Sequence, residues 1–156
     1  MAPGLDQSGE PRGRATVVGV PTVERTLRLS AGPSAPRLAR SELRAFLASE
    51  DVPPERLYEL ELLLSELVSN AVEHGSRAGD AVEVMFERRR GDLVVSVTDA
   101  GRGASAPQVR PESKAALSGR GLRAVERLSD EWAAETGAGR CAVWFRAGLP
   151  PHAASA

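Results

Sequence analysis

The most constraining feature of the chain is the segment 57–75, in which apolar residues recur at helical spacing up to a closing glycine. Pro53 and Pro54 stand two residues before it, and proline is favoured in the first turn of a helix because that turn needs no donor from it. The residues that share the apolar stripe are Leu57, Leu60, Leu64, Leu67 and Ala71. We therefore predict one long amphipathic helix that packs on a core and ends near Gly75, a candidate C-terminal cap.

Two polar residues of this helix, Glu66 and Asn70, are four positions apart and therefore share a face. The amide oxygen of Asn70 suits Mg²⁺, which takes few protein ligands and keeps several waters, and Glu66 could accept a proton from an attacking hydroxyl. On this helix alone the plainer interpretation is stronger, namely two solvated side chains on a half-exposed surface, because glutamate is a good helix former. The rest of the chain decides between the two interpretations.

The other patterns alternate between strand and helix periodicity and predict a single α/β domain. In order, we expect a strand 22–30, a helix 36–49 with Ser34 as its N-cap, the long helix, strands 81–87 and 93–98, a loop 104–118, a short helix from 122, and strands 131–136 and 141–147. These elements predict a two-layer sandwich with a mixed, mostly antiparallel sheet covered on one face by three helices. Residues 1–21 are expected to be a disordered extension and residues 148–156 a flexible tail.

Two glycine-containing segments stand at element boundaries. The first, 99–103, places Asp99, Gly101 and Gly103 at the end of a predicted buried strand. There a carboxylate can point at the edge of a ligand while the backbone approaches its flat face, although Asp-x-Gly is also an ordinary turn signal. The second, 118–122, opens the short helix, where free backbone N–H groups and the helix dipole favour an anion such as phosphate. A simple turn from loop to helix is the alternative interpretation of the second segment.

Composition and charge restrict the class of protein. The chain has 156 residues, 20 basic against 21 acidic, and a net charge of −1, so nothing favours direct binding to nucleic acid. No apolar run is long enough to span a bilayer, and residues 1–6 lack the regions of a signal peptide. Cys141, the one cysteine, lies in an apolar run and is expected to be a buried small side chain. We therefore expect a soluble cytoplasmic protein without membrane contact.

Taken together, the motifs resemble a known superfamily. Segment 66–71 on a helix, 99–103 at a strand end, 118–122 at a helix start and the closing strand 143–145 look like the N, G1 and G2 boxes of the gyrase, histidine-kinase and MutL type ATP-binding superfamily. The resemblance covers residues 22–147 and implies the Bergerat fold, a histidine kinase-like ATP-binding domain. Within that superfamily the chain is most similar to the stand-alone bacterial anti-sigma factor serine/threonine kinases.

The resemblance implies a role for each motif residue. Asn70 would bind Mg²⁺ bridging the ATP phosphates, Glu66 would be the general base, and Asp99 would receive the adenine amino group. The glycines of 99–103 would let backbone lie against the base, those of 118–122 would present N–H groups to the phosphates, and loop 104–118 would be the ATP lid. The implied nucleotide-binding set is Asn70, Asp99, Gly101, Gly103, Gly119, Arg120, Gly121 and Leu122.

The implied activity is transfer of the ATP γ-phosphate to a serine or threonine of a small anti-sigma-factor antagonist by a protein that also binds a sigma factor. One departure favours an alternative, an ATP-binding regulatory interaction module without kinase activity. Where the family often carries a threonine in the last hairpin, this chain has Arg140, Cys141 and Ala142 after Gly139. The sequence leaves dimerisation open, and a homodimer is one option.

Overall fold

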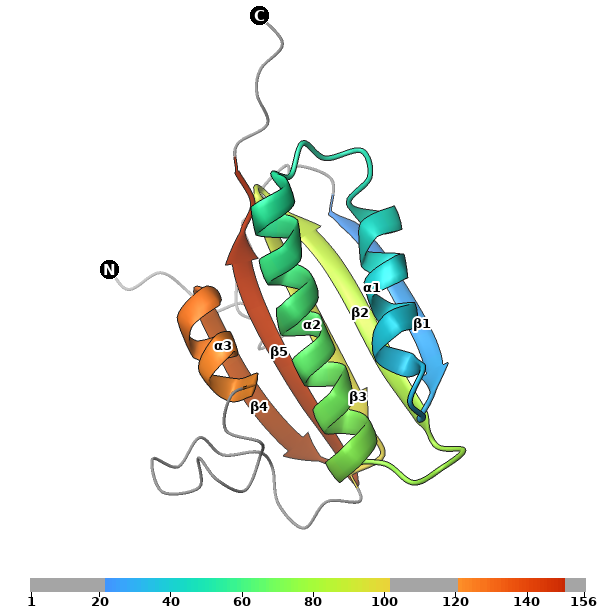
Figure 1. Ribbon diagram of the computed structural model, residues 1–156. Coiled ribbons are helices and arrows are strands. Elements are labelled where there is room, and N and C mark those ends of the chain that lie inside the picture. Colours follow the sequence, from blue (N-terminus) through green and yellow to red (C-terminus); the bar gives the residue numbers. More distant parts are fainter. Residues whose placement is uncertain (1–21, 102–120, 151–156) are drawn as a thin grey trace, which may run out of the picture.

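The computed structural model of the protein describes residues 22–101 and 121–150 (Figure 1). The predicted extension 1–21, the predicted loop 104–118 and residues 151–156 of the predicted tail 148–156 lie outside the described residues. Within residues 22–101 and 121–150, the elements in chain order are β1 (Val23–Ser30), α1 (Ala35–Phe46), α2 (Pro54–His74), β2 (Ala81–Arg89), β3 (Asp92–Asp99), α3 (Gly121–Leu128), β4 (Glu131–Gly137) and β5 (Arg140–Gly148).

The five strands of the described residues form one open sheet in the order β1-β2-β3-β5-β4, and the helices cover one face of it (Figure 1). All four strand pairings are antiparallel, so the predicted two-layer sandwich is confirmed, with an entirely antiparallel sheet where a mixed, mostly antiparallel one was predicted. The connections explain this. Two successive helices, α1 and α2, return the chain to the end of the sheet where β1 stopped, so β2 runs back beside β1. The single helix α3 makes β4 run in the direction of β3, and β5 separates those two strands.

The core lies between the helices and the sheet and follows the predicted periodicities. The predicted stripe of α2 is buried from Leu60 to Ala71, and Leu57 packs partly against it. On the sheet, alternate residues of β2 and β3 point at the helices, as period-two strands require. The largest fully buried side chains are Leu43, Leu60, Leu63, Leu64, Val68, Val82, Val84, Phe86, Leu93, Val95, Val125 and Phe145.

Several boundaries differ from the prediction. Helix α1 ends at Phe46, before the predicted 49, and Ser34 occupies its N-cap without a capping hydrogen bond from its side chain. Helix α2 begins at Pro54, before the predicted 57, because proline is well tolerated in a first turn. Strand β5 extends to Gly148, and the N–H of Leu149 donates to the carbonyl of Gly91 at 2.6 Å, so the chain stays attached to the sheet beyond the predicted end at 147.

Over residues 22–101 and 121–150, no helix combines the length and the apolar character needed to cross a membrane.

Candidate functional site

The candidate site lies where α2 and β3 both end. The Cα of Gly75, directly after α2, is so close to the side chain of Asp99 that a methyl group on it would lie 1.9 Å from Oδ2 and 2.2 Å from Cγ. Real side chains do not approach to that distance, so this position must be glycine for the carboxyl group to stay where it is. The end of the long helix therefore serves as one wall around Asp99.

Gly75 was predicted from the sequence as a helix cap, and the structure gives it a different reason to be glycine. Its N–H does donate to the carbonyl of Ala71 at 3.1 Å, as expected at a helix end. However, its φ angle is −106°, which any residue can adopt, rather than the left-handed value that favours a glycine cap. The close approach of Asp99 is what excludes a side chain here.

Asp99, the last residue of β3, has a side chain that is held and nearly buried. The residue is 8% exposed, and its Oδ1 accepts the N–H of Gly101 at 2.7 Å. Burial raises the pKa of Asp99, while hydrogen bonds from the backbone N–H groups of Gly101 and Cys141 act in the opposite direction. A buried carboxyl oriented by main-chain donors is a suitable acceptor for an amino group of a ligand.

Gly101 is also required by its surroundings. Its φ angle is +67°, in the left-handed region, and a methyl group on it would lie 2.3 Å from the carbonyl oxygen of Gly139 in the turn between β4 and β5. Both features exclude other residues. The chain after Asp99 therefore passes directly against the last hairpin, which brings residues 99–101 and 139–141 together.

Glu66 and Asn70 lie on α2, as predicted, and both are partly buried. At about 1.5 Å per residue, Asn70 is about 8 Å and Glu66 about 14 Å from Gly75 along the helix axis. Burial raises the pKa of Glu66, and the nearby negative charge of Glu73 raises it further. A carboxylate whose pKa is raised is a better proton acceptor near neutral pH than an ordinary surface glutamate.

The second glycine segment is described only from Gly121 onward. Gly121 is the first residue of α3, and Leu122 lies in its first turn, so a glycine does open the short helix as predicted. Figure 1 shows that α3 packs beside α2 on the same face of the sheet. The other predicted nucleotide contacts, Gly103, Gly119 and Arg120, lie outside the described residues.

The structure also brings in residues that the sequence reasoning did not assign to the site. Cys141 is buried, as predicted, but it is paired with Asp99 across β3 and β5, and burial and the neighbouring carboxyl raise the pKa of its thiol. Ser76 follows Gly75, and its hydroxyl is buried without a hydrogen-bond partner among the described residues. The sequence carries a signal for neither role, because both depend on which strand pairs with β3 and on how α2 ends.

This arrangement can accept an amino group of a ligand at Asp99. Asp99 supplies a buried acceptor. Gly75 lets the end of α2 pack against its carboxyl, and Gly101 lets the next backbone segment pack against Gly139. The hydroxyl of Ser76, which has no hydrogen-bond partner in the described part of the chain, is a buried polar group that a ligand or water could satisfy. Farther along α2, the amide oxygen of Asn70 has the chemistry for a hard divalent cation, with Glu66 one turn beyond it.

Comparison with solved structures supports the fold. The chain has 25% sequence identity with the protein in the crystal structure of the RsbU and RsbW domains of Rv1364c from Mycobacterium tuberculosis. The TM-score is 0.62, and the match covers 85% of this chain. That match covers 34% of the other chain, so the protein spans about a third of its length. The SiaB-SiaC complex from Pseudomonas aeruginosa matches at 23% identity and a TM-score of 0.55, over 80% of this chain and 89% of that one, which shows the fold alone. No curated protein matches the chain.

The family comparison covers most of the domain. Residues 29–147 match the family model described as the histidine kinase-like ATPase domain. The matched range contains the whole of α2, the end of β3 and the start of α3, and so spans every predicted nucleotide contact from Asn70 to Leu122. The chain therefore belongs to the histidine kinase-like ATPase domain family.

Proposed function

We propose that the protein is an ATP- and Mg²⁺-dependent serine/threonine kinase of the anti-sigma-factor type, acting in the cytoplasm. The observation that carries the proposal is the placement of Glu66 and Asn70 on one face of α2, whose end holds the buried carboxyl of Asp99. Membership of an ATPase family supports ATP as the nucleotide. Glu66, the proposed base, lies on the same helix as Asn70, the proposed Mg²⁺ ligand, and this supports phosphate transfer in addition to nucleotide binding.

In this proposal Asp99 accepts the amino group of adenine, and Gly101 lets the backbone approach the base. Asp99 can do so because its carboxyl is fixed by main-chain N–H groups and cannot turn away without losing them. The amide N–H groups at the start of α3, with the positive end of the helix dipole, face the phosphates. Gly103, Gly119 and Arg120 are proposed to complete the nucleotide site, as the resemblance implies.

The proposed chemical step uses Glu66 as the base. The serine or threonine hydroxyl of the substrate gives its proton to the Glu66 carboxylate as its oxygen bonds to the γ-phosphorus, and the bond to the β-phosphate oxygen breaks to release ADP. Asn70 is the residue that would hold Mg²⁺, which when bound neutralises phosphate charge. The partly buried position of Glu66 excludes some of the water that would otherwise compete for its proton-accepting oxygen.

The proposed phosphate acceptor is a small anti-sigma-factor antagonist protein, and the proposed regulatory target is a sigma factor. Both follow from the resemblance of the box order and compact size to anti-sigma factor kinases. The match to a structure that includes an RsbW domain supports the comparison at the level of this domain.

A second candidate function is an ATP-binding regulatory module that transfers no phosphate. The observation that favours it is the last hairpin, where Arg140 and Cys141 stand in place of the threonine common in the family. Nucleotide binding through Asp99, Gly101 and Asn70 would survive this difference, whereas a phosphate contact from the hairpin would be lost.

Phosphosite mapping separates the two functions. Tagged wild type, Glu66→Gln and the control Glu55→Gln are incubated with lysate of the source cells and Mg-ATP, and captured proteins are mapped by mass spectrometry. Glu55 is an exposed carboxylate in the first turn of the same helix. The kinase proposal expects a serine or threonine phosphosite with wild type and Glu55→Gln, and none with a Glu66→Gln variant that still binds ATP. The same captured partner without a phosphosite in any sample would select the regulatory module.

A further inference from the structure

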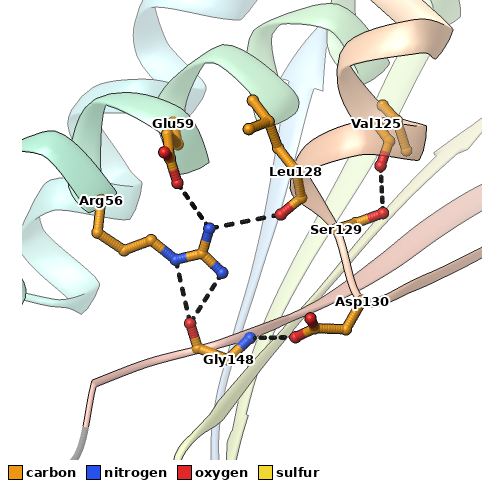
Figure 2. Close-up of polar contacts among 7 residues, drawn as sticks. All are labelled: Arg56, Glu59, Val125, Leu128, Ser129, Asp130 and Gly148. Atoms are coloured by element: carbon orange, nitrogen blue, oxygen red, sulfur yellow. Dashed lines mark hydrogen bonds and ion pairs between the residues drawn. The ribbon is translucent and has the colours of Figure 1, made fainter.

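Arg56, in the first turn of α2, joins three elements that are distant in sequence (Figure 2). Its Nε and Nη2 donate to the carbonyl of Gly148, at 3.1 and 2.9 Å. Its Nη1 donates to the carbonyl of Leu128 at 3.4 Å and to Oε2 of Glu59 at 2.7 Å. One guanidinium therefore connects the start of α2, the last residue of α3 and the end of β5.

The segment that follows α3 is attached at the same place. The N–H of Ser129 donates to the carbonyl of Val125 at 3.1 Å, and the N–H of Asp130 donates to the carbonyl of Arg146 at 2.8 Å. Oδ2 of Asp130 accepts the N–H of Gly148 at 2.7 Å. The carbonyl and the N–H of Gly148 are thus both engaged, one by Arg56 and the other by Asp130 (Figure 2).

From 123 to 128, one fully buried side chain anchors α3 in the core. The helix has 8 residues, and from 123 to 128 Val125 is the fully buried one, with Ala124 and Leu128 packed partly against the core. A helix this short gains little stability from its own hydrogen bonds. The contact from Arg56 therefore adds a polar attachment that fixes the end of α3 against the start of α2.

The geometry connects this attachment to the site. Arg56 and Asn70 are separated by about four helical turns, so they project from the same side of α2. The two helices run in opposite directions, with the end of α3 beside the start of α2 (Figure 1). From Leu128 back to Gly121 the helix axis measures about 10 Å, and Arg56 and Glu66 are about 15 Å apart along α2, so α3 runs from its attached end toward the part of α2 that carries Glu66.

We propose that Arg56 is a positioning residue for the nucleotide phosphates: by holding the end of α3 to the start of α2, it sets where the phosphate-facing start of α3 stands relative to Asn70 and Glu66. The proposal rests on the proposed function. Arg56 touches none of the reacting atoms and acts through α3. A small tilt of so short a helix about the end that Arg56 holds displaces its start, where N–H groups must meet the phosphates.

The test compares the affinities of ligands that carry three, two or no phosphates. Calorimetric affinities for Mg-ATP, Mg-ADP and adenosine are measured with wild type, Arg56→Gln, Arg56→Lys and the control Arg44→Gln. Arg44 is matched because it also contacts a carboxylate of α2, donating from Nη2 to Glu61 at 3.0 Å, but it belongs to α1. We expect Arg56→Gln to weaken binding of the two phosphate-bearing ligands about ten-fold while adenosine changes far less. Arg56→Lys should lie between, since lysine keeps a donor but lacks the fork that reaches both carbonyls.

Three results would overturn the positioning role. Equal weakening of all three ligands by Arg56→Gln would mean that Arg56 merely stabilises the fold, and equal weakening by Arg44→Gln would show that any loss of an arginine contact to α2 suffices. If Arg56→Gln does not fold, the same comparison is made with Arg56→Lys. The role is rejected if the affinities of Arg56→Lys for Mg-ATP and Mg-ADP, relative to adenosine, equal those of wild type. Failure of wild type to bind ATP would overturn the proposed function itself, which keeps the two failures distinct.

Discussion

The Cα of Gly75 and the carboxyl of Asp99 are in contact, and a methyl group on Gly75 would lie 1.9 Å from Oδ2. This contact fixes the end of α2 against the end of β3. It ties the helix that carries Glu66 and Asn70 to the proposed adenine acceptor without any intervening side chain. The geometry of the candidate site therefore depends on the small size of Gly75.

Gly75→Ala should displace Asp99 and weaken nucleotide binding. The added methyl group overlaps the carboxyl, and overpacking of this kind destabilises proteins by about 1–3 kcal/mol. Urea unfolding and Mg-ATP titration measure the two effects. Gly32→Ala is the matched control, because a Cβ at Gly32 would meet nothing within 4 Å, and it should leave nucleotide binding unchanged.

A double-mutant cycle identifies the cause. In an Asp99→Ala background the methyl group of Gly75→Ala has room, so the substitution should lower the free energy of unfolding by clearly less than in wild type. The same loss in both backgrounds would show that the contact with Asp99 is not what requires glycine at this position.

Gly101→Ala should destabilise the protein more than Gly79→Ala. Both glycines have left-handed φ angles, +67° and +89°, so alanine costs about 1–2 kcal/mol at each. At Gly101 the methyl group would also meet the carbonyl of Gly139 at 2.3 Å, whereas nothing lies within 4 Å at Gly79. Urea midpoints of the two variants measure the difference, and equal midpoints would contradict the close packing of Gly101 on the last hairpin.

The elements with strong periodicity could be predicted from the sequence. The stripe of α2 and the alternation of β2 and β3 depend on local spacing, which a buried face imposes on each element separately. The motif residues were likewise recognisable: Glu66 and Asn70 by their four-residue spacing on one helix, and Asp99 and Gly101 by their place at the end of a strand.

Contacts between distant segments could not be predicted. Gly75 reads as a helix cap in sequence, and its contact with Asp99 exists because α2 crosses the sheet above the end of β3. Arg56 reads as an ordinary charge in a first turn, yet its partner Gly148 is 92 positions away. The pairing of Cys141 with Asp99 required the strand order, since β5 inserts between β3 and β4.

Replacing Asp99 should change how stability depends on pH. Burial raises the pKa of Asp99, so the folded protein holds this proton more tightly than the unfolded chain does. The free energy of unfolding therefore falls as pH rises from the ordinary aspartate range through the folded pKa, and the loss is complete above it. Asparagine does not ionise, so the unfolding free energy of Asp99→Asn minus that of wild type should increase across this window. Urea melts at a series of pH values test the slope, and a decrease would contradict burial as the dominant cause.

Glu73→Gln should shift the pH dependence of phosphate transfer. Burial is the larger cause of the raised pKa of Glu66, and the charge of Glu73 is the second. Removing that charge lowers the pKa of Glu66, so the base stays ionised to lower pH and the acid limb of the profile of kcat moves to lower pH. Glu55→Gln serves as the control. An acid limb that stays in place in Glu73→Gln would argue against Glu66 as the base.

Calorimetric titration of wild type, Asp99→Asn and the control Asp51→Asn with Mg-ATP tests the site most directly. Asp51 is exposed in the loop before α2. An asparagine places an NH₂ group where Asp99 has an oxygen, so a donor meets the amino group of adenine. The site described here predicts saturable binding by wild type and Asp51→Asn, and binding at least about ten-fold weaker by Asp99→Asn. Equal affinities in all three proteins, or no binding by wild type, would contradict it.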